Sequence, residues 1–268
     1  MAVIDGVRFL KRKNHAICHI DFFSNGFKSL VRNQLSSVCH GPSKASWQRK
    51  AYNYKNTLKG FLDRYDSKSD DIKIGMIGEL LTHLLILEYF PEFNAVSPYF
   101  NMEEKSVKKG FDIILFSKEN SEIWITEVKS GELHKNKNAN QTNKVLLGKA
   151  KRDLKGRLNE NESTLWENAI NGALVALEDK RDAKDAVLEI LSDISDEVEE
   201  NKAISTDKNV ILVTSLFASF SDQIEEGEIK IYSDRVKKEK LFKELVVFSI
   251  QKNTYERVVE FLREEVKL

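Results

Sequence analysis

Two acidic residues and a lysine in the middle of the sequence have a spacing that suits metal-dependent phosphate chemistry. Asp112 ends the segment GFD, and Glu127 and Lys129 stand in ITEVK. Glu127 and Lys129 are two positions apart, so on a strand their side chains point to the same face. Carboxylate oxygens are preferred ligands of Mg²⁺ and Mn²⁺. A lysine beside such an ion can position a water molecule or stabilise charge that develops on a phosphate.

A hairpin is expected to bring the two acids together. Phe111–Ser117 and Glu122–Lys129 have the character of strands, and the polar turn between them has hairpin length. A two-residue loop and a four-residue loop give the same register, which places Asp112 opposite Glu127 with Cβ atoms about 5 Å apart. An odd-length loop would break this register. Opposed carboxylates repel each other, and the apolar residues around them indicate a covered strand, so the pair needs a cation.

The alternative interpretation of the Glu-x-Lys pattern is an exposed strand end with ordinary surface charges, because short motifs occur often by chance. The opposed Asp112 and the apolar residues on both strands favour the metal site over this alternative.

A long apolar helix is expected before the hairpin. Ile72–Phe90 has a wide apolar face, and Pro91 ends it. Glycine costs a helix about 1 kcal/mol relative to alanine, so Gly75 and Gly78, three positions apart, indicate close packing against another element. Glu79 follows Gly78 inside this apolar helix. A packing glycine pair beside an exposed glutamate is the simpler interpretation of the helix alone.

The other apolar segments predict an α/β fold with a mixed central β-sheet flanked by helices. Further strands are expected at His15–Phe22, Ala95–Phe100, Asn209–Phe217 and Leu245–Ile250, and further helices at Trp47–Tyr65, about Ala139–Leu158 and Tyr255–Val266, while Gly26–Val38 suits either. The polar segment Asp66–Asp71 suggests a boundary between an N-terminal extension, residues 1–69, that packs on the core and a core of residues 70–268.

The charge balance limits how the chain could hold nucleic acid. Lysine plus arginine equals aspartate plus glutamate, at 42 each. A protein that binds nucleic acid without help is usually basic, so binding here is expected to be local, weak or supplied by a partner. The local candidates are Lys144, Lys149, Lys151 and Arg152, which follow the acidic site. A solvated helix face explains this basic segment about equally well.

Composition also limits the cellular compartment and the classes of function that the sequence suits. The two cysteines cannot form a disulfide framework, which suits a reducing cytoplasm. No apolar segment approaches the roughly 20 residues that a membrane helix needs, so no membrane association is expected. A glycine-rich phosphate loop is absent from the sequence, which excludes an ATPase of that kind and gives no reason to expect a small-molecule cofactor.

The pattern resembles the PD-(D/E)xK nuclease superfamily, in which an acidic helix is followed by a β-meander. The matching residues are Gly78-Glu79, Phe111-Asp112 and Glu127-Val128-Lys129. More closely, the segments GMIGELLTHLLILEYFP, KKGFDIILF and WITEVKSG are similar to the HamA family, the nuclease subunits of Hachiman anti-phage defence systems.

This resemblance implies a restriction-endonuclease-like core and a Mg²⁺- or Mn²⁺-dependent DNA nuclease that works beside a superfamily-2 helicase. It implies that Asp112, Glu127 and Val128 form the metal site, that Lys129 acts on the attacking water and that Glu79 supports the metal shell. The chain departs from the literal motif because Phe111, not a proline, precedes Asp112. The family's first motif position varies, so this departure weakens the motif and not the site.

The helix after the lysine often contributes a polar residue in such nucleases, and Gln141, Lys144 and Lys149 are unranked candidates. Two other functions stay open. One is a non-catalytic assembly or regulatory subunit that keeps a nuclease-like fold, which the neutral net charge also fits. The other is a restriction endonuclease with its own sequence specificity, for which no DNA-reading segment is evident.

Overall fold

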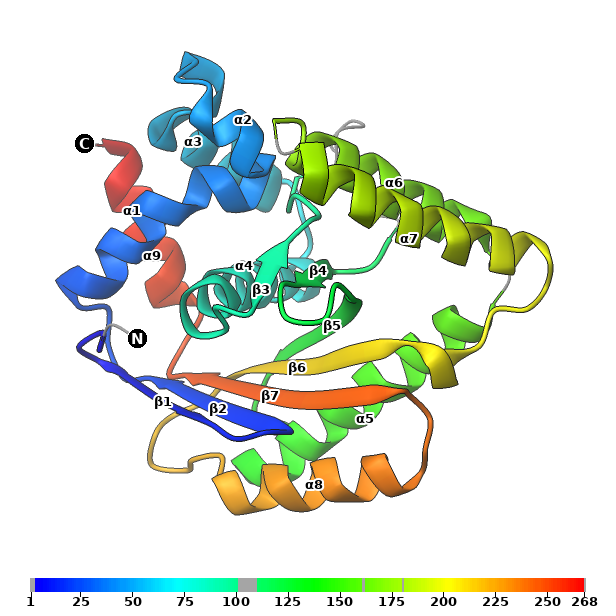
Figure 1. Ribbon diagram of the computed structural model, residues 1–268. Coiled ribbons are helices and arrows are strands. Elements are labelled where there is room, and N and C mark those ends of the chain that lie inside the picture. Colours follow the sequence, from blue (N-terminus) through cyan, green and yellow to red (C-terminus); the bar gives the residue numbers. More distant parts are fainter. Residues whose placement is uncertain (1–2, 101–109, 161, 180, 268) are drawn as a thin grey trace.

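The computed structural model describes residues 3–100, 110–160, 162–179 and 181–267, and these form a curled, mixed seven-stranded sheet with helices on both faces (Figure 1). The strands are β1 (Val7–Lys11), β2 (His15–Ile20), β3 (Phe93–Ala95), β4 (Ile113–Ser117), β5 (Ile123–Glu132), β6 (Asn209–Phe217) and β7 (Glu244–Lys252). Their order in the sheet is β1-β2-β7-β6-β5-β4-β3. The pairs among β2, β7, β6 and β5 are parallel, and β1 and the β3–β4–β5 meander run antiparallel to their neighbours. The expected mixed sheet flanked by helices is confirmed.

Helices lie above and below this sheet in Figure 1. They are α1 (Asn25–His40), α2 (Pro42–Ser46), α3 (Tyr54–Asp66), α4 (Asp70–Tyr89), α5 (Ala139–Asn159), α6 (Ser163–Ala176), α7 (Arg181–Glu199), α8 (Glu226–Lys238) and α9 (Glu256–Lys267), with short 3-10 turns at Lys50–Tyr52 and Ser205–Asp207. One apolar core joins α1, α3, α4 and α9 to the sheet, and a second joins α5, α6, α7 and α8 to its other side. None of the helices in the described part of the chain is both long and apolar enough to cross a membrane.

Burial on both faces explains why β5 and β6 occupy the middle of the sheet. All residues of β6 are buried, as expected for a parallel strand covered on both sides. In β5, Ile123 and Ile125 join the core beneath α5, while Val128 joins the core beneath α4. Glu127 and Lys129 alternate with Val128, so they lie on the α5 side of the sheet.

Gly78 is where α4 approaches the sheet most closely. A Cβ atom at Gly78 would overlap the Ser130 hydroxyl and lie 2.7 Å from Ser130 Cβ and 2.9 Å from Ser215 Cβ. Ser130 and Ser215 are paired across β5 and β6. A Cβ atom at Gly75 would have nothing within 4 Å. Close packing is therefore confirmed for Gly78 and wrong for Gly75.

The N-terminal segment is joined to the core through the sheet itself. His15 of β2 pairs with Val247 of β7, and β1 extends the same sheet. The ambiguous segment after it is helical: Ser24 caps α1, and its hydroxyl accepts a hydrogen bond from Phe27 N at 3.2 Å. Residues 1–69 thus supply two strands besides packing helices, and a division at residue 70 remains a prediction.

The sequence analysis misplaced one strand and missed one helix. The strand expected at Ala95–Phe100 is wrong except at Ala95, because β3 comprises Phe93–Ala95 and is followed by one further hydrogen bond to β4, from Val96 N to Ile114 O at 2.9 Å. Helix α8 had not been expected. It is the crossover that two adjacent parallel strands, β6 and β7, require.

Candidate active site

The β4–β5 hairpin has the register that places the two acids together. Ile113 pairs with Thr126, and Ser117 N donates to Glu122 O at 2.8 Å, so the loop comprises the four residues Lys118–Ser121. Asp112 stands next in this register, just before β4, and faces Glu127. Its Oδ2 atom accepts a hydrogen bond of 2.7 Å from the backbone N–H of Val128. The even-length loop predicted from sequence is confirmed.

Glu127 is the most deeply buried acid of the site, with 1% of its side chain exposed. Its Oε1 atom lies 2.8 Å from Lys129 Nζ, and its Oε2 atom pairs with the guanidinium of Arg157 from α5. Burial raises the pKa of Glu127, and the charge of Asp112 raises it further, while Arg157 and Lys129 oppose the rise. The carboxylate is therefore held in an apolar site where the charged form depends on nearby cations.

Lys129 bridges Glu127 and a second acid on α5. Its Nζ atom lies 2.8 Å from Glu127 Oε1 and 2.8 Å from Asp153 Oδ2, with 28% of the lysine side chain exposed. Burial lowers the pKa of Lys129, but the charges and hydrogen bonds of Glu127 and Asp153 raise it more, and the net shift is upward. Lys129 is accordingly a fixed cation at neutral pH.

Glu79 approaches the site from the opposite face of the sheet. It lies on α4, and its Oε1 atom is 4.0 Å from Nε2 of the buried His83 one turn later. Burial raises the pKa of Tyr99 well above its usual range, and the charges of Glu79 and Asp112 both contribute. Tyr99 is thus close to both acids, which places Glu79 on the Asp112 side of the site.

The donor set at Asp112 and Glu127 fits a hard divalent cation. Two opposed carboxylates, one of them buried, supply oxygen ligands of the kind that Mg²⁺ and Mn²⁺ bind, and Val128 adds a backbone carbonyl within the same short segment. Within the described ranges, no three histidine, cysteine or acidic residues are close enough together to hold an ion.

The model of the HamA family matches residues 6–266 of the chain, from β1 to the end of α9. The chain belongs to the HamA family. Membership indicates a subunit of a Hachiman defence system and extends the resemblance seen in the sequence motifs to the N-terminal strands and the C-terminal helix. No curated protein and no solved structure matches the chain.

Two residues, Asp153 and Arg157, contact Lys129 and Glu127 but were not among the predicted site residues. Both lie on the flank of α5 that faces Glu127 and Lys129. Their spacing of one helical turn was the available signal, since residues four apart share a side of a helix. Gln141, considered earlier for this role, instead caps its own helix with Asn138.

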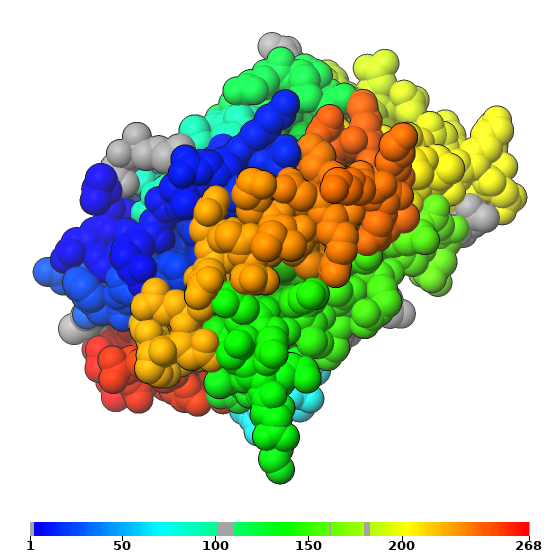
Figure 2. Space-filling view, turned by 90° about the horizontal axis from the view of Figure 1, so that it is seen from below, coloured from blue at the N-terminus to red at the C-terminus, as the bar shows by residue number. Residues whose placement is uncertain are grey.

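The four basic residues expected to bind nucleic acid lie on two flanks of α5. Lys151 forms an ion pair of 2.6 Å with Glu239, and Lys144 lines a small hollow shared with α8. The surfaces of α5 (green) and α8 (orange) adjoin in Figure 2. Lys149 lies one turn before Asp153, on the same side of the helix. Arg152 is exposed on the α8 side, where its charge acts on Tyr232. Of the four residues, Lys149 therefore shares the side of α5 that carries Asp153.

Proposed function

We propose that this HamA family member is a Mg²⁺- or Mn²⁺-dependent DNA nuclease that acts in Hachiman defence together with a superfamily-2 helicase. The observation that carries the proposal is the pair of opposed acids at Asp112 and Glu127, one of them buried, with Lys129 in direct contact. Such a group of charges is costly in a sheet unless it serves a ligand.

Each residue of the site has a separate role in phosphodiester hydrolysis. Asp112, Glu127 and the Val128 carbonyl would hold the ion, which polarises a phosphate and makes a bound water more acidic. Lys129 remains protonated because its pKa is raised, so it orients the water or stabilises charge on the phosphate and does not take up a proton. Glu79 acts from α4 as an orienting group near Asp112.

A partner that delivers DNA fits the charge of the chain. The balanced 42 basic and 42 acidic residues give weak long-range attraction to DNA. Lys149, on the same side of α5 as Asp153, then contacts a phosphate locally beside the site. We expect slow cleavage by the isolated chain at physiological salt and faster cleavage with the helicase.

The competing function is a non-catalytic assembly subunit. It is favoured by the saturation of Glu127, whose two oxygens already pair with cations of the chain itself. A subunit of this kind would bind the helicase and leave DNA intact in every metal.

The test compares plasmid cleavage by the chain and its helicase partner in Mg²⁺, Mn²⁺ and Ca²⁺. Lys129→Ala should abolish cleavage, while Lys59→Ala, an exposed lysine on α3, should leave it unchanged. Ca²⁺ should support binding without cleavage, because it is larger and accepts looser coordination than in-line attack requires. Equal cleavage by the parent and Lys129→Ala, or no cleavage in any metal, would reject the nuclease.

A further inference from the structure

Both oxygens of the buried Glu127 carboxylate are paired with cations from different elements. Lys129 reaches Oε1 along β5, and Arg157 reaches Oε2 from α5. A buried carboxylate requires such partners. A divalent ion that binds Glu127 must therefore compete with at least one of them.

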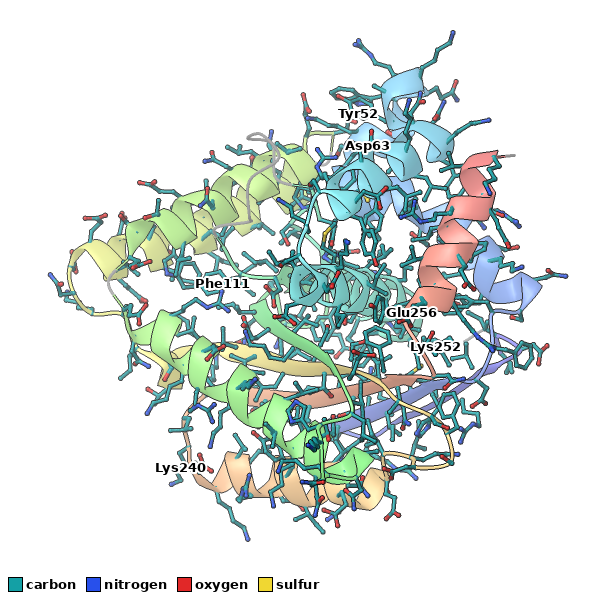
Figure 3. The ribbon with its side chains drawn as sticks, turned by 180° about the vertical axis from the view of Figure 1, so that it is seen from behind. Tyr52, Asp63, Phe111, Lys240, Lys252 and Glu256 are labelled. Carbon is teal, nitrogen blue, oxygen red and sulfur yellow. The ribbon has the colours of Figure 1, made fainter. Side chains whose placement is uncertain are left out.

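Arg157 has contacts that hold it in place without Glu127. Its Nη1 atom donates to the backbone carbonyl of Gly110 at 3.0 Å, and its guanidinium lies 5.9 Å from the centre of the Phe111 ring. Phe111 in turn packs against Trp166 of α6, with ring centres 4.8 Å apart, and lies between α5 and the α6–α7 pair (Figure 3). The guanidinium is thus fixed to the two residues that lead into Asp112.

Charge balance indicates what Arg157 does once an ion is bound. On the α5 side of the sheet, with every group in its charged form, Asp112, Glu127 and Asp153 supply three negative charges and Lys129 and Arg157 supply two positive ones. The group is left with one net negative charge. A divalent ion reverses this to one positive charge, which a single phosphodiester neutralises.

We propose that Arg157 occupies Glu127 in place of a metal ion and transfers to a phosphate oxygen of the DNA when the ion binds. The inference rests on the proposed metal-dependent nuclease. A guanidinium suits both partners, because its planar fork of donors matches carboxylate and phosphate alike. Its contacts to Gly110 and Phe111 keep it at the site during the exchange. Arg157 is then a phosphate-binding residue that also delays metal binding until DNA is present.

The test measures metal and DNA binding separately on the full-length chain. Mn²⁺ affinity is determined by calorimetry without DNA, and the affinity for a partly duplex oligonucleotide is determined in Ca²⁺. Arg157→Gln should bind Mn²⁺ roughly tenfold more tightly, the effect of losing one competing charged hydrogen bond, and should bind DNA roughly tenfold more weakly. Lys155→Gln, which removes one positive charge from an exposed position of the same helix, is the control for metal binding and should leave Mn²⁺ affinity unchanged.

Opposite changes in the two affinities distinguish this role from a structural one, since a damaged fold weakens both. Arg157→Lys keeps the charge and the fold but loses the planar fork, so intermediate values are expected. Equal or weaker Mn²⁺ binding by Arg157→Gln, or parent-like values of both affinities in Arg157→Lys, would overturn the role of Arg157 alone. A parent chain that binds no Mn²⁺ would reject the proposed function itself.

Discussion

Alanine at Gly78 and alanine at Gly75 should change the stability of α4 in opposite directions. Both substitutions replace glycine inside a helix, and each gains about 1 kcal/mol of helix propensity. At Gly75 the new methyl group meets nothing within 4 Å, so the gain should be realised. For a chain of 268 residues this corresponds to an increase of about 2–4 °C in Tm.

At Gly78 the same methyl group would collide with the sheet. It would lie 2.7 Å from Ser130 Cβ and 2.9 Å from Ser215 Cβ, atoms attached directly to the backbones of β5 and β6. Neither atom belongs to a flexible chain end, so helix and sheet must separate. Overpacking of this kind costs roughly 1–3 kcal/mol. We place the overpacking cost of Gly78→Ala near the upper end of this range. After the gain in helix propensity, the free energy of unfolding should fall by about 1–2 kcal/mol.

Urea denaturation followed by circular dichroism measures both variants against the parent. The two free energies of unfolding should differ by roughly 2–3 kcal/mol, with similar slopes. Combining Gly78→Ala with Ser130→Gly should recover part of the loss, because the closest contacts are removed. If Gly78→Ala proved as stable as Gly75→Ala, α4 would not lie against the sheet at Ser130, and the position argued for Glu79 would have to be abandoned.

Three further outcomes are expected. Asp112→Asn keeps an acceptor for Val128 N–H and removes a charge, so in EDTA it should unfold at or above the parental temperature. Asp112→Ala leaves that N–H without its acceptor and should lower the free energy of unfolding by about 1 kcal/mol. Added Mg²⁺ should stabilise the parent alone. Asp153→Asn weakens the hold on Lys129 and should slow single-turnover cleavage by roughly tenfold at most, far less than Lys129→Ala. Hydrogen bonds from Arg32 and Tyr54 lower the pKa of Glu265 in the folded state. The ionised Glu265 therefore stabilises the fold above its ordinary pKa, and this stabilisation is lost as the pH falls. Glu265→Gln should flatten the decline in the free energy of unfolding, measured in urea, between about pH 5 and pH 3.

The register of the hairpin at the site could be predicted because it depends only on the length and position of the short loop between the two strands. A two-residue loop at Glu119–Asn120 and a four-residue loop at Lys118–Ser121 both pair Asp112 with Glu127, and the ladder from Ile113 onward has that register. The apolar residues around Glu127 likewise indicated a central strand. Such features depend on residues close in sequence, where alternation and turn length suffice.

The contacts that complete the site could not be predicted in the same way. Arg157 reaches Glu127 only because α5 crosses β5 at one particular angle, which depends on the whole apolar face beneath the helix. Helix α8 was missed because it is strongly polar and its burial is confined to a few positions. The parallel pairing of β6 and β7 that demands it is itself a non-local property.

The pairing of β2 with β7 has a consequence for the time at which the sheet can be completed. His15 pairs with Val247, so β2 must wait until β7, more than 200 residues later in the sequence, has been made before it enters the sheet. Contacts between distant parts of a chain close slowly because the intervening loop loses entropy. During synthesis the segment carrying Asp112 and Glu127 leaves the ribosome long before β6 and β7 exist to support it. A nascent chain that has not yet made β7 should therefore lack an assembled site, which would delay the proposed nuclease activity until that strand is in place.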